Sequence, residues 1–163
     1  MIRPCTESDS AEIFAIVNDA AQAYKSVIPS DRWREPYMPL AELHEEISAG
    51  VKFWGYEDDG RLVGVMGMQL VKDVTLIRHA YVRTGMRSRG IGSKLLAHLL
   101  GPINGRILVG TWQVADWAVR FYQKHGFELV GEAEKNRLLK SYWNIPRRQI
   151  ETSVVLVHHK PVV

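Results

Sequence analysis

The chain has 163 residues, of which 46% are hydrophobic and 24% are charged. This length predicts a single domain over residues 1–163, because domains usually hold about 100–200 residues. The composition excludes disordered, collagen-like and low-complexity chains. A single cysteine, Cys5, excludes an intrachain disulfide framework and favours a reducing compartment.

The charge balance is mildly basic, since 21 Lys and Arg residues against 18 Asp and Glu residues give a net charge of +3. That balance suits an anionic small molecule, and no stretch interleaves clustered basic and aromatic residues as nucleic-acid-binding surfaces do. No uninterrupted apolar run approaches the roughly 20 residues of a membrane span. The first residues are charged where a signal peptide has its apolar stretch. We therefore expect a cytoplasmic enzyme or binding protein with no nucleic-acid or membrane partner.

The first fifty residues predict one short strand and two helices. The strand covers residues 2–4. Thr6 followed by Asp9 is typical of a helix start, because a hydroxyl caps a free N–H and a carboxylate stabilises the positive first turn. Apolar residues at helical spacing continue this helix to residues 24–25. A second, shorter helix is expected over residues 40–50, where a glycine ends it.

The stretch between these two helices, residues 26–39, is rich in proline and polar residues and is predicted to be a long loop. It carries two bulky aromatic residues, Trp33 and Tyr37. Aromatic residues in such a loop either cover a pocket or cover core, and both interpretations stay open at this stage.

The rest of the chain predicts a β-rich middle followed by alternating strands and helices. Asp59-Gly60 is a strong hairpin signal, because a type I′ turn needs positive φ at both central positions. The expected strands cover residues 51–57, 61–71, 74–83, 106–111, 127–131 and 150–157, and the expected helices cover residues 91–100 and the stretch from Val114 to its Gly126 cap. This order predicts a mixed α/β sheet with helices on both faces.

The most informative stretch is a glycine-rich turn between a strand and a helix. Gly90 and Gly92 allow a tight turn and a close backbone approach, and the free N–H groups of the helix start favour a phosphate or pyrophosphate. Basic residues lie nearby in the turn. The P-loop pattern fails because Ile91 stands where lysine is required, and the dinucleotide pattern fails because Leu95 replaces its third glycine. The alternative is a turn that binds nothing.

Two motifs resemble those of the GNAT acetyltransferase superfamily. The first is R-x-x-G-x-G, formed by Arg87, Gly90 and Gly92. The second lies about 30 residues on, where A-V-R-F-Y-Q-K-H-G-F (118–127) is similar to the family's A-I-x-F-Y-x-K-x-G-F. The resemblance covers residues 2–157 and implies a GNAT-like mixed, centrally splayed β-sheet of about seven strands. It also implies an N-acetyltransferase that uses acetyl-CoA as co-substrate and no metal.

The resemblance assigns expected roles to residues along this cofactor. A bulge in the strand 74–83 would present backbone groups to the pantetheine arm, and the glycine-rich turn would hold the pyrophosphate. The expected cofactor-binding residues are Ala80, Tyr81, Val82, Arg87, Ser88, Arg89, Gly90, Ile91, Gly92 and Ser93. Tyr122 is the expected acid that protonates the departing thiolate. Its alternative role is the apolar stripe of the helix 114–125.

Thr84 replaces the proline that is usual in the first motif, and two further departures from the family pattern matter more. Ala115 stands where many members carry an asparagine that touches the cofactor, and Leu76 stands where some members carry a glutamate base. His79, on the same strand as Leu76, is the candidate base, directly or through water, with a structural role as the alternative. These departures leave a rival open, an acyl-CoA-binding sensor module without turnover.

The acceptor is expected to be a primary amine on a small molecule or a peptide. Its pocket is predicted between the loop 26–39, the split beside the strand 74–83 and the segment 142–149. Trp33, Tyr37 and Trp143 are the expected substrate-binding residues. Arg147 and Arg148 either hold an anion of the acceptor or lie on the surface. This composition favours an amine with an apolar or aromatic part over a polyamine.

Two further expectations concern metal and assembly. His158 and His159 are adjacent on a strand, so they point to opposite faces and predict no metal site. The final strand, 150–157, is of a kind that pairs or swaps across a homodimer.

Overall fold

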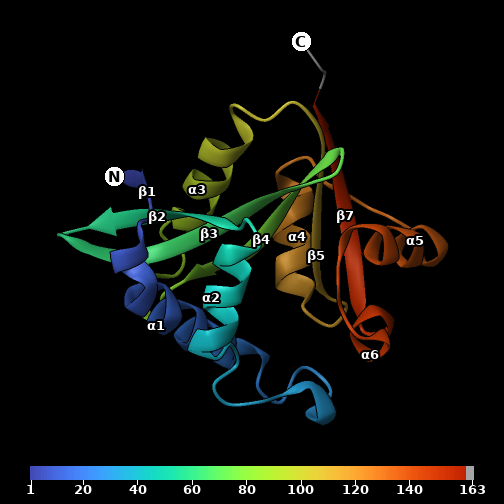
Figure 1. Cartoon of the computed structure of the whole chain (residues 1–163), viewed down its shortest axis with the longest axis horizontal. Helices are drawn as coiled ribbons and strands as arrows, with labels where there is room; N and C mark the ends of the chain where they lie inside the picture. Colours follow the sequence, from blue (N-terminus) through green and yellow to red (C-terminus); the bar gives the residue numbers. More distant parts are fainter. Residues whose placement is uncertain (161–163) are drawn as a thin grey trace.

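The strands of the chain form one sheet of seven strands in the order β1-β2-β3-β4-β5-β7-β6. The computed structural model describes residues 1–160 (Figure 1). The strands are β1 (Ile2–Pro4), β2 (Lys52–Asp58), β3 (Arg61–Val71), β4 (Val74–Val82), β5 (Gly105–Trp112), β6 (Glu128–Leu129) and β7 (Ser153–Lys160). All neighbours are antiparallel except β4 and β5, which are parallel.

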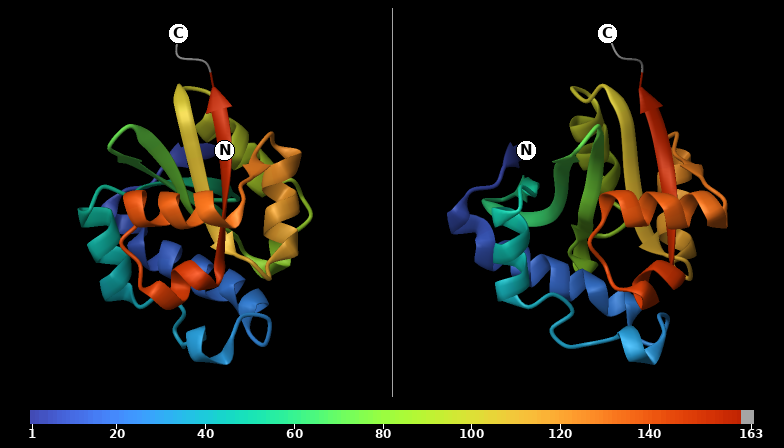
Figure 2. Two further views of the ribbon diagram at one scale, coloured as in Figure 1. Left: turned by 90° about the vertical axis from the view of Figure 1, so that its right-hand side faces the viewer. Right: turned by 45° about the vertical axis from the view of Figure 1, so that its right-hand side comes forward.

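The helices cover both faces of this sheet (Figures 1 and 2). They are α1 (Ser10–Ala20), α2 (Leu40–Ser48), α3 (Ile91–Leu100), α4 (Asp116–Lys124), α5 (Glu132–Tyr142) and α6 (Arg147–Glu151). Helices α3 and α4 pack on one face through a core that includes Leu95 and Tyr122. Helices α1 and α2 pack through Ile16 and Leu43, and α5 packs through Leu138. Along β4 and β5, neighbouring residues belong in turn to the core under α3 and α4 and to the core under α5. Because neighbouring residues of a strand point to opposite faces, α5 lies on the other face of the sheet from α3 and α4.

The expected architecture is confirmed, including the mixed sheet, the seven strands and the helices on both faces. The helix that starts at Thr6 also ends where expected, because α1 continues as a 3₁₀ turn to Tyr24. The homodimer stays a prediction. Within the described chain, β7 pairs with β5 from Ser153 to Lys160 and with β6 over two residues.

The segment after residue 131 differs from the expectation. It contains α5 and α6, neither of which the periodicity predicted, and the last strand begins at Ser153 instead of residue 150. The apolar stripe of α5 is interrupted by Lys135, which is buried although it is charged. Its Nζ donates a hydrogen bond to the carbonyl of Ile150 at 2.8 Å. A lysine at a core-facing position interrupts the apolar spacing by which a helix is recognised in a sequence.

The start of α1 is held by an ion pair that reaches back to β1. Arg3 donates hydrogen bonds to both carboxylate oxygens of Asp9, at 2.9 and 3.0 Å, and the Thr6 backbone N–H donates to Asp9 Oδ2 at 2.7 Å. Asp9 is buried, and these interactions, led by that with Arg3, lower its pKa to about 2.

This pair gives a pH-dependent contribution to stability. The pKa of Asp9 in the folded protein is depressed. Its contribution to the free energy of unfolding is therefore complete above the ordinary carboxyl pKa near 4 and is lost as the pH falls through about 2. We expect Asp9→Asn to lower the free energy of unfolding at pH 7 by about 1–2 kcal/mol, and this difference to shrink by roughly half at pH 3. Urea unfolding measures both. Asp58→Asn, at an exposed carboxylate of β2, is the control. A difference independent of pH would contradict the assignment.

Candidate functional site

The site lies where β4 and β5 separate. The two strands pair in parallel only over Thr75–Ile77 and Ile107–Val109. Beyond Ile77 and Val109 they have no ladder pairs, so the sheet is split there. Two cavities, one on each face of the sheet, meet at this split and share the lining residues Tyr24, Ile77, His79, Tyr81, Gly110 and Thr111.

A bulge in β4 lies at the split. Val65 pairs with Tyr81 and Gly67 pairs with Arg78, so Met66 alone faces His79 and Ala80. His79 has φ of 55°, in the left-handed region that non-glycine residues rarely adopt. That conformation costs about 1–2 kcal/mol and persists where the surrounding structure imposes it, often at functional sites. The bulge implied by the family resemblance is therefore present.

The larger cavity is a groove of about 680 Å³ between β4, α3 and α4, here called the β4–α3 groove. It extends from the glycine-rich turn along β4 to Tyr122. Nine of the ten expected cofactor-binding residues line it: Ala80, Tyr81, Val82, Arg87, Ser88, Gly90, Ile91, Gly92 and Ser93. Arg89, the tenth, is exposed and is not among the lining residues.

The turn end of the groove is built to accept an anion. Gly90 precedes α3 with φ of 76°, and a Cβ there would have no neighbour within 4 Å. No side chain caps α3, and Lys94 N–H donates to the Gly90 carbonyl at 3.0 Å. The N–H groups of residues 91–93, in the first turn, therefore have no partner inside the helix. Arg87 anchors the turn by donating to the Ala20 carbonyl at 3.1 Å. A pyrophosphate fits this arrangement.

Tyr122 lies on the groove wall near the split. Its ring packs edge-on against Phe121 and Phe127, at centroid distances of 5.1 and 5.4 Å, so it belongs to the core as well as to the groove. Burial raises the pKa of Tyr122 above the ordinary value, which keeps the hydroxyl protonated at neutral pH. A protonated phenol in this position can donate to a thiolate.

Ala115, which replaces the asparagine of many family members, lies immediately before α4 and is completely buried. It packs with Ile28 and Trp112. An apolar contact with the loop 26–39 therefore occupies this position.

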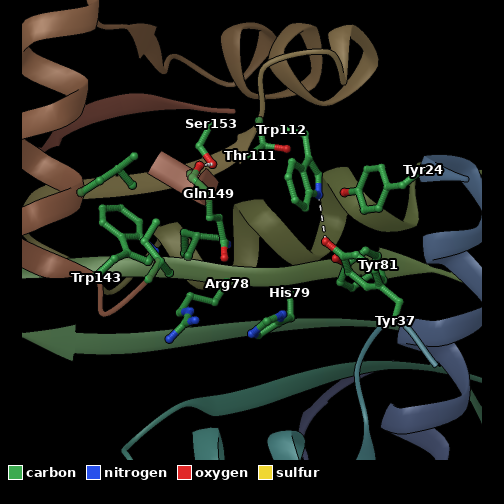
Figure 3. Close-up of a pocket in the computed structure, with 14 residues that line it drawn as sticks. Tyr24, Tyr37, Arg78, His79, Tyr81, Thr111, Trp112, Trp143, Gln149 and Ser153 are labelled. Carbon is green, nitrogen blue, oxygen red and sulfur yellow. Dashed lines mark hydrogen bonds between the residues drawn. The ribbon is translucent and has the colours of Figure 1, made fainter. Parts of the chain in front are cut away.

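The smaller cavity, here called the aromatic pocket, has a volume of about 120 Å³. Figure 3 shows Tyr24, Tyr37 and Trp112 at one end and Trp143 at the other. Besides the residues shared with the groove, it is lined by Tyr37, Arg78, Trp112, Leu139, Trp143, Ile145, Gln149 and Ser153. Among the residues that the structure describes, none of those lining it is an aspartate or a glutamate.

The loop 26–39 is fixed against the pocket by hydrogen bonds. Trp112 Nε1 donates to the Tyr37 hydroxyl at 2.8 Å (Figure 3). At the end of the loop, the Asn18 side chain donates to the Met38 carbonyl at 3.0 Å and accepts from the Met38 N–H at 2.9 Å. Burial raises the pKa of Tyr24, Tyr37 and Tyr81, so these phenols are neutral hydrogen-bonding groups.

The structure brings together most of the residues that were expected to bind the acceptor amine or to act as its base. Tyr37 and Trp143 line the aromatic pocket, and His79 lines both cavities. Trp33 does not line the pocket; its ring stacks on that of Tyr37 at 5.9 Å between centroids.

Arg147 and Arg148 are both engaged by carboxylates. Arg147 pairs with Glu151 at 3.0 Å, and Arg148 pairs with Asp31 at 2.9 Å. The second pair joins α6 to the loop 26–39. Both arginines are exposed, and neither lines the aromatic pocket.

Sequence reasoning missed several pocket residues. Arg78, Trp112, Gln149 and Ser153 line it, and Glu46 contacts His79 from α2. One signal was present for Trp112, because it directly follows the strand expected over residues 106–111, and ligand sites gather at the carboxyl ends of parallel strands. Glu46 carried no local signal, since it looks like any charged residue of an amphipathic helix.

A profile of the acetyltransferase (GNAT) domain family matches residues 15–140. The chain therefore belongs to the GNAT acetyltransferase family, whose activity is acyl transfer from acyl-CoA. No curated protein matches the chain in a sequence search.

Solved structures share the fold over nearly the whole chain. A PaiA N-acetyltransferase from Thermoplasma acidophilum in complex with coenzyme A has a TM-score of 0.72 at 16% identity, covering 98% of each chain. A GNAT family acetyltransferase from Elizabethkingia anophelis with acetyl-CoA bound has a TM-score of 0.61 at 19% identity, covering 98% of this chain and 97% of that one. A ribosomal-protein-alanine N-acetyltransferase from Brucella melitensis has a TM-score of 0.65 at 21% identity, covering 96% of each chain.

Within residues 1–160, no three His, Cys, Asp or Glu side chains gather as a metal site would require. None of the helices in that range has the length and apolar character needed to cross a membrane.

The glycine-rich turn gives a direct test of cofactor binding. We expect Gly90→Val to weaken the affinity for coenzyme A roughly tenfold or more, because it strains the turn and fills the approach to the N–H groups; tenfold is only about 1.4 kcal/mol. Gly60→Val is the matched control, since Gly60 has the same φ of 76° and equally open surroundings at the β2–β3 turn. Calorimetric titration measures the affinity. Unchanged binding by a folded Gly90→Val protein would remove the turn from the site.

Proposed function

We propose that the protein transfers the acetyl group of acetyl-CoA to a primary amine. The observation that carries this proposal is the meeting of two cavities at the β4–β5 split, one with an anion-accepting turn and one with aromatic walls. Family membership supports the acyl-CoA donor. The β4–α3 groove suits a long ligand with a diphosphate at one end, and the aromatic pocket suits a smaller molecule that reaches the split from the opposite face.

In this proposal, residues 87–93 hold the pyrophosphate and the backbone of Ala80–Val82 holds the pantetheine arm. The bulge supports this assignment, because it leaves backbone groups of β4 outside the ladder with β3. The thioester then lies at the split, between Tyr122 on the groove side and His79 on the pocket side.

The reaction begins with attack of a neutral amine on the thioester carbonyl carbon. A C–N bond forms, and the carbonyl π electrons move to oxygen. When the tetrahedral intermediate collapses, the C–S bond breaks and the thiolate takes a proton from the Tyr122 hydroxyl. The proton lost from the nitrogen restores the phenol. The products are an N-substituted acetamide and coenzyme A.

The acceptor class follows from the walls of the aromatic pocket. Tyr37, Trp112 and Trp143 offer flat apolar surfaces, and the pocket has no lining carboxylate among the described residues. A polyamine would need such carboxylates to pair with its several ammonium groups. We therefore propose an amine with an apolar or aromatic part. Trp33 would act through Tyr37, on which it stacks.

The rival function, a sensor that binds acyl-CoA without turnover, is tested by thiol release. Acetyl-CoA is incubated with a panel of primary amines, and free thiol is followed with a chromogenic reagent. Release that depends on both amine and enzyme is expected. Tight acetyl-CoA binding with no release for any amine would favour the sensor.

Tyr122→Phe separates catalysis from binding. The ring and its packing remain, so we expect an unchanged affinity for coenzyme A and a fall in kcat of about 10²-fold, the low end for a proton-transfer group. Steady-state kinetics and calorimetry measure the two quantities. Tyr56→Phe, on β2 and outside both cavities, controls for loss of a phenol. Wild-type kcat in Tyr122→Phe, with chemistry rate-limiting, would return Tyr122 to a purely structural role.

The acceptor class predicts the outcome of a competition. An amine with an aromatic part should be acetylated in preference to spermidine at equal concentration, and mass spectrometry of the products measures the ratio. Trp143→Ala should raise the acceptor KM more than Trp33→Ala, because only Trp143 lines the pocket. A clear preference for spermidine, or full activity of the double Trp33→Ala/Trp143→Ala variant, would contradict the assigned pocket.

A further inference from the structure

A buried carboxylate lies behind the split, on the α2 side of β4. Glu46 Oε2 contacts His79 Nε2, and the two side chains are 16% and 15% exposed. Both contacting atoms are shielded from solvent. The other carboxylate oxygen, Oε1, accepts a hydrogen bond from Arg78 at 3.1 Å. Arg78 in turn donates to Gln69 Oε1 at 3.1 Å, so the carboxylate is held from two directions.

The charge state of Glu46 follows from these contacts. Burial raises the pKa of its carboxyl, but the contact with His79 and the positive charge of Arg78 outweigh burial, so that pKa lies below the ordinary value. Glu46 is therefore ionised at neutral pH. An ionised carboxylate on Nε2 selects the tautomer that carries its proton there, which leaves Nδ1 with the free lone pair.

The position of His79 makes that lone pair relevant to the reaction. His79 lines both cavities, so it lies where an amine entering the aromatic pocket would meet the thioester. Its left-handed backbone conformation and its ring stacking on Phe53, at 6.0 Å between centroids, fix the ring further. Leu76, where some family members carry a base, offers no proton acceptor. A base oriented by a third group is the general arrangement by which proteins activate a nucleophile.

We propose that Glu46 positions His79 as the proton acceptor for the incoming ammonium group. The proposal rests on the proposed N-acetyltransferase function. One proton moves from the R–NH3⁺ nitrogen to Nδ1 of His79, and Glu46 balances the charge of the resulting imidazolium. The neutral amine then attacks the thioester, and the imidazolium releases its proton to solvent before the next turnover. Glu46 touches no substrate and is a positioning residue.

Other groups around His79 set the sign of the pH dependence. Glu46 faces it from α2, Arg78 and Tyr81 flank it on β4, and Tyr24 and Tyr37 face the same pocket from the N-terminal segment. The tyrosines are neutral, so the charges are the carboxylate, which favours the imidazolium, and the Arg78 guanidinium, which disfavours it. Removal of the carboxylate leaves the guanidinium unopposed.

The test is Glu46→Gln, with Glu45→Gln as the matched control, because Glu45 loses the same charge from an exposed position of α2. We expect kcat/KM for the amine to fall about 10- to 100-fold at pH 7 in Glu46→Gln, as for loss of a group that orients a reactive one. The acidic limb of its pH profile should move to lower pH. The defect should narrow as the pH rises toward about 10, where an alkylamine loses its proton unaided. Coenzyme A affinity should not change.

A second readout does not depend on turnover. Nitrogen-15 chemical shifts of His79 should report the tautomer protonated at Nε2 in the wild type and in Glu45→Gln, and a changed tautomer population in Glu46→Gln. A Glu46→Gln defect that stays constant with pH would indicate a structural role and overturn the proposal, as would wild-type kcat/KM in that variant. Absence of thiol release by the wild type with any amine would instead refute the proposed function itself.

Discussion

The separation of β4 from β5 after three parallel pairs is the constraint on which the site depends. A closed ladder would bury Gly110 and Thr111 against β4 and leave the two faces of the sheet unconnected. The bulge opposite Met66 acts at the same place, because the extra residue bends β4 and frees its backbone groups. The strained conformation of His79 is the local cost of this arrangement. The groove, the pocket and their junction follow from these two irregularities in an otherwise regular sheet.

The sequence predicted the parts of the site that contiguous residues form. The turn 85–92 and the segment 118–127 combine backbone freedom, charge and packing within a few residues, so their local pattern survives in the fold. The order of strands and helices before residue 131 was predictable for the same reason, because hydrophobic periodicity is a local property. The strand 74–83 was likewise recognisable, although its bulge came from the family resemblance and not from the spacing of its residues.

The parts that sequence did not predict are formed by residues far apart in the chain. Glu46 reaches His79 across 33 positions of sequence only because α2 packs on the sheet beside β4. Arg148 looked available to a substrate, yet Asp31, which is 117 residues away, occupies its guanidinium. Helix α5 was hidden by Lys135, which is buried and donates a hydrogen bond to a carbonyl of the segment that follows. Pairings of this kind depend on tertiary contacts, which propensity and spacing do not encode.

The connection between the two cavities also sets a limit on the acyl donor. Because the aromatic pocket and the β4–α3 groove share the walls Tyr24, Ile77 and Thr111, a longer acyl chain carried through the split would extend into the space assigned to the acceptor. The pocket measures only about 120 Å³, and each added methylene would displace part of the amine. On the proposed orientation, the acyl chain of a butyryl or longer thioester would compete with the acceptor for the space beyond the opening. The opening between β4 and β5 would therefore limit the length of the acyl chain.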